Sequence, residues 1–301
     1  MSGFEQLPSS VLQAGAIFLS IIIEALPFVL IGAVISGFIE VFITPEKVVR
    51  FLPKNTFLAI LFGAFLGFIF PSCECGIVPI VNRLLEKKVP SYTAIPFLVT
   101  APLINPIVLF ATYTAFGNSW TIALYRVIGS MLVALILGLI FGFLLKEPIT
   151  KQQVTHSHQQ DVSDKSVWQK IAYVLMHAID EFFDTGRYLI FGSLFASLVQ
   201  VYVPTAFLTS IGHSPLSAIL LMMALAFLLS LCSEADAFIG VSFLSSFGPA
   251  PVIAFLVIGP MVDVKNLLMM RHYFTGRSIL TFITIVSLVI LSYSLLLGGL
   301  L

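Results

Sequence analysis

Residues Ile122 to Leu145 read IALYRVIGSMLVALILGLIFGFLL, and Arg126 is the one charged residue among them. About 18 to 20 consecutive apolar residues are enough for a helix to cross the hydrocarbon core of a bilayer. Of the 301 residues, 58% are hydrophobic and 10% are charged, whereas roughly 25% of residues are charged in ordinary soluble domains. The sequence therefore predicts an all-α polytopic membrane protein, with the lipid bilayer as its first partner.

Overall charge and the N-terminus exclude several other classes of protein. Fifteen basic and fifteen acidic residues cancel, so binding to nucleic acid is not expected. The first ten residues contain no Lys or Arg, whereas a cleaved signal peptide begins with a basic region. The Gly-x-x-x-x-Gly-Lys-Ser/Thr motif of ATP-hydrolysing P-loops is absent from the chain. The sequence indicates neither an enzyme nor a need for a cofactor.

The two halves of the chain resemble each other when residue n is placed beside residue n+160. The shift aligns pairs of acidic and glycine residues, namely Glu24 with Asp184, Gly32 with Gly192, and Glu74 with Glu234. Further along the chain the offset falls by two residues, to 158, and it then aligns Pro102 with Pro260 and Asn105 with Asp263. We expect a first membrane repeat at 1–146, a polar linker at 147–169 and a second repeat at 170–301.

The basic residues predict how the chain is oriented in the membrane. They concentrate in four segments, Lys47 to Lys54, Arg83 to Lys88, Lys146 to Lys170, and Lys265 to Arg277. The positive-inside rule places these segments, and with them the 146–170 linker, in the cytoplasm of a multi-pass plasma (inner) membrane protein.

This orientation predicts two hairpins in the membrane. Both ends of Phe57 to Leu85 then face the cytoplasm, so the segment is expected to enter and return, bending at Pro71 to Gly76. Leu216 to Phe247 is expected to enter from outside and bend at Cys232 to Asp236. Each half would have three full-span helices and one re-entrant hairpin, and the two repeats would be inverted. Eight full spans are the alternative.

Acidic residues in or beside apolar helices are the strongest sign of function. A carboxylate at the centre of a membrane helix costs about 2.5 to 3.5 kcal/mol on insertion scales, so each one implies a compensating role. We expect a substrate site near the membrane midplane, formed by Cys73, Glu74, Cys75, Cys232, Glu234, Asp236, Asn105 and Asp263. Glu24 and Asp184, in the first helix of each half, are candidates for proton coupling.

The cysteines indicate what kind of substrate such a site would hold. Cys73-Glu74-Cys75 and Cys232-Ser233-Glu234 lack the spacing of a disulfide framework. Thiolates beside carboxylates suit a borderline or soft ion, such as Zn²⁺, Cu⁺ or trivalent arsenic. The expected ligands are Cys73, Glu74, Cys75, Cys232 and Glu234. Buried cysteine also packs as a small apolar side chain, which is the alternative.

Proline residues interrupt the apolar stretches at Ala101–Pro106 and Gly259–Asp263. Proline in a membrane helix frees backbone carbonyls that can line a cavity. Asn105 and Asp263 therefore either contribute to the site or lie at simple kinks.

Pro71-Ser72-Cys73-Glu74-Cys75-Gly76, Ala101-Pro102-Leu103-Ile104-Asn105-Pro106 and Cys232-Ser233-Glu234-Ala235-Asp236-Ala237-Phe238 together resemble a known family. It is the predicted-permease family that includes the organoarsenical efflux permease ArsP. The resemblance covers nearly the whole chain and implies a plasma-membrane permease. For the arsenical members it implies export of trivalent organoarsenicals through cysteine contacts, here Cys73, Cys75 and Cys232. For some relatives it also implies a small membrane-anchored accessory protein linked to metal supply.

Three functions remain open on the sequence. The first is a secondary transporter of a thiophilic metal or metalloid species, in which proton and cargo compete for a buried carboxylate. The second is a transmembrane thiol-disulfide electron carrier, which the acids beside each cysteine disfavour because a nearby carboxylate disfavours the reactive thiolate. The third is a non-transporting membrane scaffold.

Overall fold

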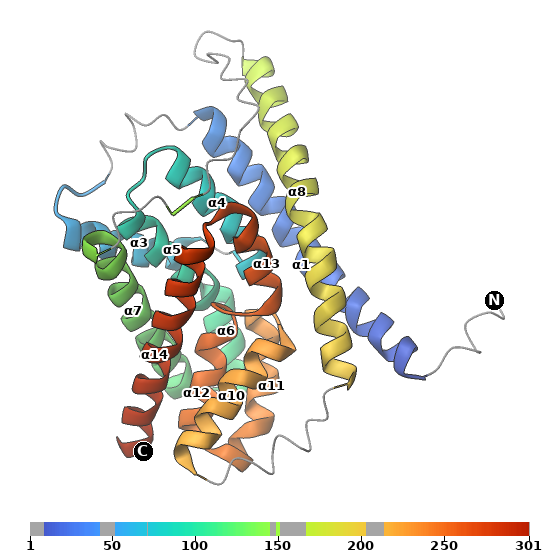
Figure 1. Cartoon of the computed structure of the whole chain (residues 1–301), viewed down its shortest axis with the longest axis vertical. Coiled ribbons are helices and arrows are strands. Elements are labelled where there is room, and N and C mark those ends of the chain that lie inside the picture. The colour runs from blue at the N-terminus through green and yellow to red at the C-terminus, as the bar shows by residue number, and fades with distance from the viewer. Residues whose placement is uncertain are drawn as a thin grey trace.

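The computed structural model describes residues 9–42, 52–70, 72–144, 149–150, 167–202 and 214–300. The helices in chain order are α1 (Ser9–Phe42), α3 (Thr56–Ile69), α4 (Glu74–Glu86), α5 (Ser91–Ile104), α6 (Pro106–Ala115), α7 (Trp120–Leu139) with a π-helical end η1 (Ile140–Leu144), α8 (Val167–Tyr202), α10 (Pro215–Leu229), α11 (Ser233–Phe247), α12 (Pro249–Ile258), α13 (Val264–Tyr273) and α14 (Gly276–Leu300) (Figure 1). Most of the expected 147–169 linker, and Pro71 of the first expected bend, lie outside the described residues.

Four helical segments of the described chain are long and apolar enough to cross a membrane: Ser9–Phe42, Ser91–Ala115, Trp120–Leu144 and Gly276–Leu300. Helix α8 is longer, at 36 residues, but it carries five charged side chains between Lys170 and Arg187. Three shorter apolar helices, α3, α10 and α12, complete the apolar set. The chain is therefore a polytopic, nearly all-helical membrane protein. Six full spans are expected from the sequence, and four segments of the described chain have the length and composition of a span.

Four interruptions divide the inner helices, and each one falls at a residue that caps the helix that follows. Cys73 and Cys232 are the N-caps of α4 and α11. Asn105 and Asp263 are the N-caps of α6 and α13, and their side chains accept backbone hydrogen bonds there. An N-cap side chain satisfies one of the amide groups that the first turn of a helix leaves free.

Helices α3 and α4 form a hairpin whose two outer ends lie at one end of the molecule. Along α3, Gly63 packs against the backbone of Thr93 and Gly67 packs against Thr100, so α3 runs parallel to α5. Helix α5 starts just after α4 ends. The start of α3 and the end of α4 therefore lie beside the start of α5.

Helices α10 and α11 form a second hairpin, whose outer ends lie at the opposite end of the molecule. A hollow of about 580 Å³ is lined by the start of α10, the end of α11, the start of α12 and the end of α14. Helix α14 begins at the end of the molecule where α5 begins, because Thr275 pairs with Ile149 just beyond η1 and Gly142 of η1 packs on Tyr92. The two hairpins thus approach each other from opposite ends.

Helices α1 and α8 lie side by side along one flank of this core (Figure 1). Glycines bring their backbones unusually close to the inner helices. A Cβ atom at Gly32 would lie 2.6 Å from the carbonyl oxygen of Gly76, and one at Gly192 would lie 2.9 Å from the Cα atom of Lys265. Small residues allow this close approach between membrane helices. Both flanking helices therefore pack against segments that carry the inner polar residues.

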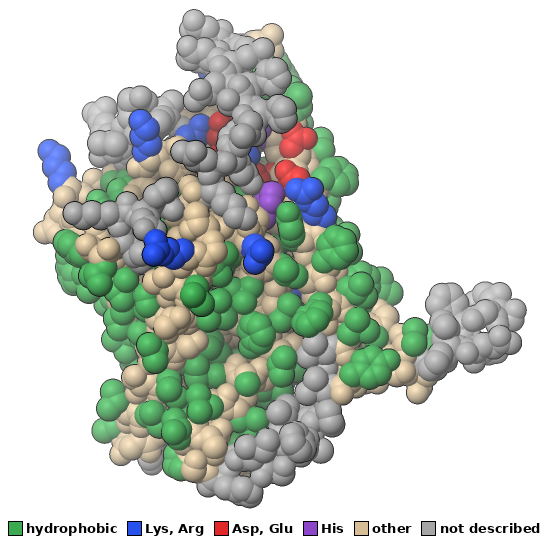
Figure 2. Space-filling model, in the orientation of Figure 1, with side chains coloured by type: hydrophobic (Ala, Val, Ile, Leu, Met, Phe, Trp, Pro, Cys, Tyr) green, Lys and Arg blue, Asp and Glu red, His purple; other side chains and the backbone are tan. Residues whose placement is uncertain are grey.

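The surface agrees with a membrane location. Hydrophobic side chains are spread over the middle and lower parts of the visible face, and the Lys and Arg side chains lie toward the end where α8 begins (Figure 2). Exposed large apolar residues continue along α1 and α8, for example Ile23 at 70% and Phe183 at 70% exposed. Apolar area on this scale is expected of a surface that faces lipid rather than water.

Candidate functional site

The first residues of α4 and α11 meet inside the molecule. The Ser233 hydroxyl donates a hydrogen bond to Oε2 of Glu74 over 3.3 Å, and both side chains are fully buried. These residues start the returning helix of each hairpin. The positive ends of two helix dipoles thus point toward one region, which favours acidic side chains in their first turns.

The three cysteines of the chain are free and buried beside this meeting point. Cys73, Cys75 and Cys232 lie close enough to interact electrostatically with one another. Cys232 also interacts electrostatically with Glu24. The fold therefore gathers Cys73, Cys75 and Cys232 into one thiol cluster, although Cys73 and Cys232 are 159 residues apart in the sequence.

A buried lysine faces the acidic residues of the site. Nζ of Lys265 lies 3.6 Å from Oε1 of Glu74 and 4.0 Å from Oδ2 of Asp263, and all three side chains are 0% exposed. The sequence places Lys265 among the cytoplasmic basic residues. This interpretation is wrong, because Lys265 is the second residue of α13 and its side chain points into the protein.

A buried arginine lies on the other side of the meeting point. Nη1 of Arg126 donates to the Thr112 hydroxyl over 2.9 Å, and Nη2 donates to the Ser233 carbonyl over 3.1 Å. Arg126 also interacts electrostatically with Asp236 and Glu234. A charged side chain within a membrane span needs such partners to offset the cost of its burial. Arg126 thereby joins α6 and α7 of the first half to α11 of the second.

The remaining acids of the second hairpin differ in burial. Asp236 is buried, with Oδ2 against Gly259, where a Cβ atom would lie 2.6 Å from that oxygen. Glu234 is half-buried. Oε1 of Glu74, Oδ2 of Asp236, Oδ2 of Asp263 and Nζ of Lys265 are buried without a hydrogen-bond partner. Buried polar groups are rarely left in this state, and four of them are concentrated in this region.

Asn105 and Asp263, expected as equivalent contributors, have different surroundings. Oδ1 of Asn105 accepts from the Val108 amide and Nδ2 donates to the Ala101 carbonyl, so its side chain bridges α5 and α6. Oδ1 of Asp263 accepts from the Asn266 amide, which leaves Oδ2 facing Lys265. The structure therefore brings Asp263 into the acidic region and assigns Asn105 local capping bonds.

Glu24 and Asp184, aligned by the repeat, also differ. Glu24 interacts electrostatically with Lys265 and Glu74, and it is half-buried at the edge of the site. The Asp184 carboxylate pairs with Arg187 over 2.9 Å, with both side chains about half exposed. Asp184 thus lies on the outer face of α8. The buried acid of α8 is Glu181, one turn earlier.

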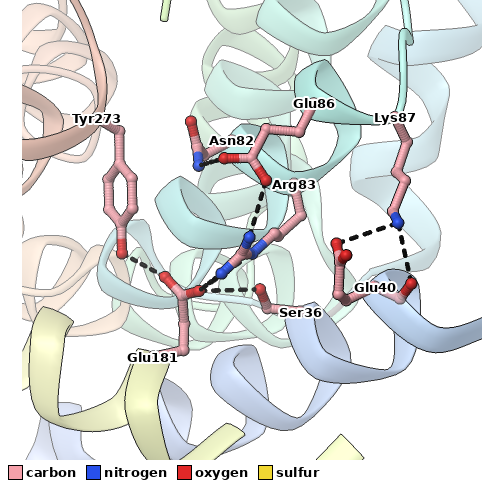
Figure 3. A network of polar contacts seen from close by, with 8 residues as sticks. All are labelled: Ser36, Glu40, Asn82, Arg83, Glu86, Lys87, Glu181 and Tyr273. Carbon is pink, nitrogen blue, oxygen red and sulfur yellow. Dashed lines mark hydrogen bonds and ion pairs between the residues drawn. The ribbon is translucent and has the colours of Figure 1, made fainter. Parts of the chain in front are cut away.

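Glu181 is the centre of a second polar network, which lies toward the end where α4 finishes (Figure 3). Its Oε2 lies 3.0 Å from Nη2 of Arg83 and 3.4 Å from the Ser36 hydroxyl, and its Oε1 accepts from the Tyr273 hydroxyl. Arg83 also forms an ion pair with Glu86, and Lys87 forms one with Glu40 near the end of α1. The network fastens α1, α4, α8 and α13 together, and the sequence does not reveal it.

The expected metal ligands do not converge on one point in this conformation. Among the described residues, no three His, Cys, Asp or Glu side chains are arranged to hold a metal ion. The physical reason is visible beside Glu74, where the Lys265 ammonium takes the position of a positive charge between two carboxylates. An internal cation and a metal ion cannot both occupy that position.

Comparison with known proteins places this arrangement in a family. The sequence profile described as "Predicted permease" matches residues 10–299. The chain belongs to this predicted-permease family. The family resemblance inferred from the sequence is thereby confirmed, and permeases are transporters rather than enzymes. No solved structure matches the chain.

Two relatives that match this chain over nearly their whole length support the assignment to the family. A Streptococcus mutans protein, named as a subunit of a two-component membrane permease complex, is 64% identical over 298 residues and covers 99% of each chain. The Bacillus subtilis protein UPF0718 protein YcgR is 49% identical over 291 residues, covering 97% of this chain and 99% of its own.

Proposed function

We propose that this permease is a secondary transporter that moves a thiophilic metal or metalloid species across the plasma membrane. The observation that carries the proposal is the meeting of two thiol-bearing hairpins at Glu74 and Ser233. Three free thiols and several carboxylates lie within a buried region formed by interrupted helices. Secondary transporters hold their substrates at sites of this kind, where helix ends and unwound backbone face a cavity near the midplane.

The two halves are proposed to be inverted repeats, 1–146 and 170–301, joined by a cytoplasmic linker at 147–169. Supporting this, the hairpin α3–α4 precedes the interrupted pair α5–α6, and the hairpin α10–α11 precedes the interrupted pair α12–α13. The contacts also correspond, because α4 packs against α13 and α11 packs against α6. Two hairpins that enter from opposite ends match two re-entrant segments better than eight full spans.

A second subunit is part of the proposal. The Streptococcus mutans relative is named as a subunit of a two-component membrane permease complex. At 64% identity over nearly the whole chain, a two-component assembly is proposed here as well, with the small membrane-anchored accessory protein that the family resemblance implies as its second component. Co-purification with the product of a neighbouring gene, from the native host, would test it.

Flux into sealed vesicles tests the function. Vesicles containing the native protein, with its accessory subunit if one co-purifies, would be offered Zn²⁺, Cu⁺, arsenite and methylarsenite in turn. We expect flux of at least one of these species, and its loss in Cys73→Ser and in Glu74→Gln. Flux of none of them, or equal flux in all three proteins, would contradict the proposal. Disulfide reduction outside the vesicle that depends on Cys73 but not on Glu74 would favour the electron carrier.

A further inference from the structure

Lys265 is held in an unusual electrostatic position. It is the second residue of α13, where the positive end of the helix dipole disfavours a cation. Its backbone is fixed by Gly192 of α8, whose close approach leaves no room for a Cβ atom. The ammonium group is nevertheless 0% exposed. The attraction of nearby carboxylates is therefore what holds the charge in place.

The contacts of the Lys265 ammonium group with the carboxylates are looser than those of an ion pair that only stabilises the fold. Its distances to Glu74 and Asp263, 3.6 and 4.0 Å, exceed hydrogen-bonding distance. Nζ and the facing oxygens Oε1 of Glu74 and Oδ2 of Asp263 all lack hydrogen-bond partners. A buried ion pair that served stability alone would need these bonds to offset the cost of desolvation.

The thiol cluster adjoins the same charge. Lys265 interacts electrostatically with Cys75 and Cys232 as well as with Glu74 and Asp263. Anything that binds the thiols and Glu74 together must therefore contend with the ammonium group. A cation can replace it, because the cation supplies the positive charge that the carboxylates lose. A neutral species cannot, because removing the ammonium would leave the two carboxylates uncompensated.

We propose that Lys265 is a tethered cation that the cargo displaces from Glu74 and Asp263, and that the cargo is consequently a thiophilic metal cation rather than a neutral metalloid species. The inference rests on the proposed function and narrows its substrate class. Cargo binding moves the ammonium group away from the carboxylates. Return of the ammonium group then competes the cargo off the site and completes a transport step.

Zinc titration of purified protein tests the competition. The proteins compared would be the native chain, Lys265→Met and, as a matched control, Lys54→Met, which alters an exposed lysine. For the binding titrations, each of the three would be prepared in a background of His156→Ala and His158→Ala, so that the linker histidines contribute no zinc ligands. Removing the competitor should tighten zinc binding about tenfold or more and slow zinc flux, while Lys54→Met changes neither. Methylarsenite binding should not change in any variant.

Weaker or unchanged zinc binding in Lys265→Met would overturn the role of Lys265 and leave the proposed function standing. Flux of arsenite or methylarsenite without flux of Zn²⁺ or Cu⁺ in the native protein would overturn the cationic cargo alone, whereas flux of none of the four species would overturn the proposed function as well. If Lys265→Met fails to fold, zinc binding to Lys265→Arg tests the competition instead. A guanidinium binds carboxylates in a bidentate manner, so this stronger competitor should weaken zinc binding, and tighter binding would overturn the proposal.

Discussion

The Ser233 hydroxyl donates a hydrogen bond to Glu74 across 159 residues of sequence, and it thereby joins the starts of α4 and α11. Each of these helices is the returning arm of a hairpin, and each is capped by a cysteine. The contact places carboxylates, thiols and two helix N-termini in one buried region. How that region is held together can be tested by substitution.

Arg126 is expected to be essential to this region, because it bonds to Thr112 and to the backbone of Ser233. Arg126→Leu would leave these acceptors unpaired and remove a positive charge that faces Asp236. We expect a loss of about 2 to 4 kcal/mol in unfolding free energy and loss of flux. Denaturant unfolding in detergent would measure the first quantity. Leu124→Met, on an exposed position of α7, is the control, and equal stability of the two variants would refute the role of Arg126.

The close contact of α1 with α4 is expected to tolerate no side chain at Gly32. Alanine there would bring its Cβ atom within 2.6 Å of the Gly76 carbonyl oxygen, which is backbone and cannot rotate away. Gly32→Ala should therefore separate the two helices and lower stability by about 1 to 3 kcal/mol.

Gly15→Ala supplies the matched control for this substitution. It lies in the same helix, and a Cβ atom there would have no neighbour within 4 Å. Alanine is the better helix former, so this variant should be as stable as the native protein or slightly more so. Thermal unfolding of both variants in the same detergent would show the difference. Equal melting temperatures would mean that α1 does not approach α4 as closely as described.

Two acids on α8 are expected to differ sharply in their contribution to stability. Glu181→Gln breaks a nearly buried pair with Arg83 and weakens the bond from Tyr273, so it should cost about 3 kcal/mol. Asp184→Asn breaks a half-exposed pair with Arg187 and should cost less than about 1 kcal/mol. Unfolding in denaturant would compare the two, and a larger loss for Asp184→Asn would contradict the network of Figure 3.

The proposed re-entrant hairpins predict an unusual labelling pattern. Single cysteines would be placed at Asn55 and Lys88, which flank the first hairpin, and at Ser214 and Ser246, which flank the second, in a background with Cys73, Cys75 and Cys232 replaced by Ser. A membrane-impermeant maleimide should reach the first pair from the cytoplasm and the second pair from outside. Reaction of Asn55→Cys and Lys88→Cys from opposite sides would instead establish full spans.

Much of the fold follows from the sequence because the membrane imposes strong rules on it. Apolar runs such as Ile122 to Leu145 define helices directly, and α7 with η1 covers nearly that range, Trp120 to Leu144. The Pro-rich segments near Asn105 and Asp263 also fall at real interruptions. The long helix α8 is less predictable, since the charged residues from Asp180 to Arg187 weaken its apolar signal.

The site could be predicted only in part. The acids and thiols at both hairpin bends come together as the paired motifs suggest. The sequence does not predict Lys265 or Arg126 in this region. A basic residue near the end of a span is normally cytoplasmic, which is what the sequence predicts for Lys265. The residues around Arg126 do not reveal which distant side chains it pairs with. Burial and partner choice depend on how helices far apart in the chain pack, which periodicity and motifs do not encode. Arg126, isolated in an apolar run, was the available signal.

A double-mutant cycle on flux examines whether the two hairpins form one site. Vesicles would contain the native protein, Cys73→Ser, Cys232→Ser and the double variant, with the cargo that the native protein transports most rapidly. Residues that bind one cargo together act as a unit, so their effects should not add. We predict that each single variant loses at least about tenfold in flux and that the double variant loses little more. Native flux in Cys232→Ser, or losses that multiply in the double variant, would contradict a shared site.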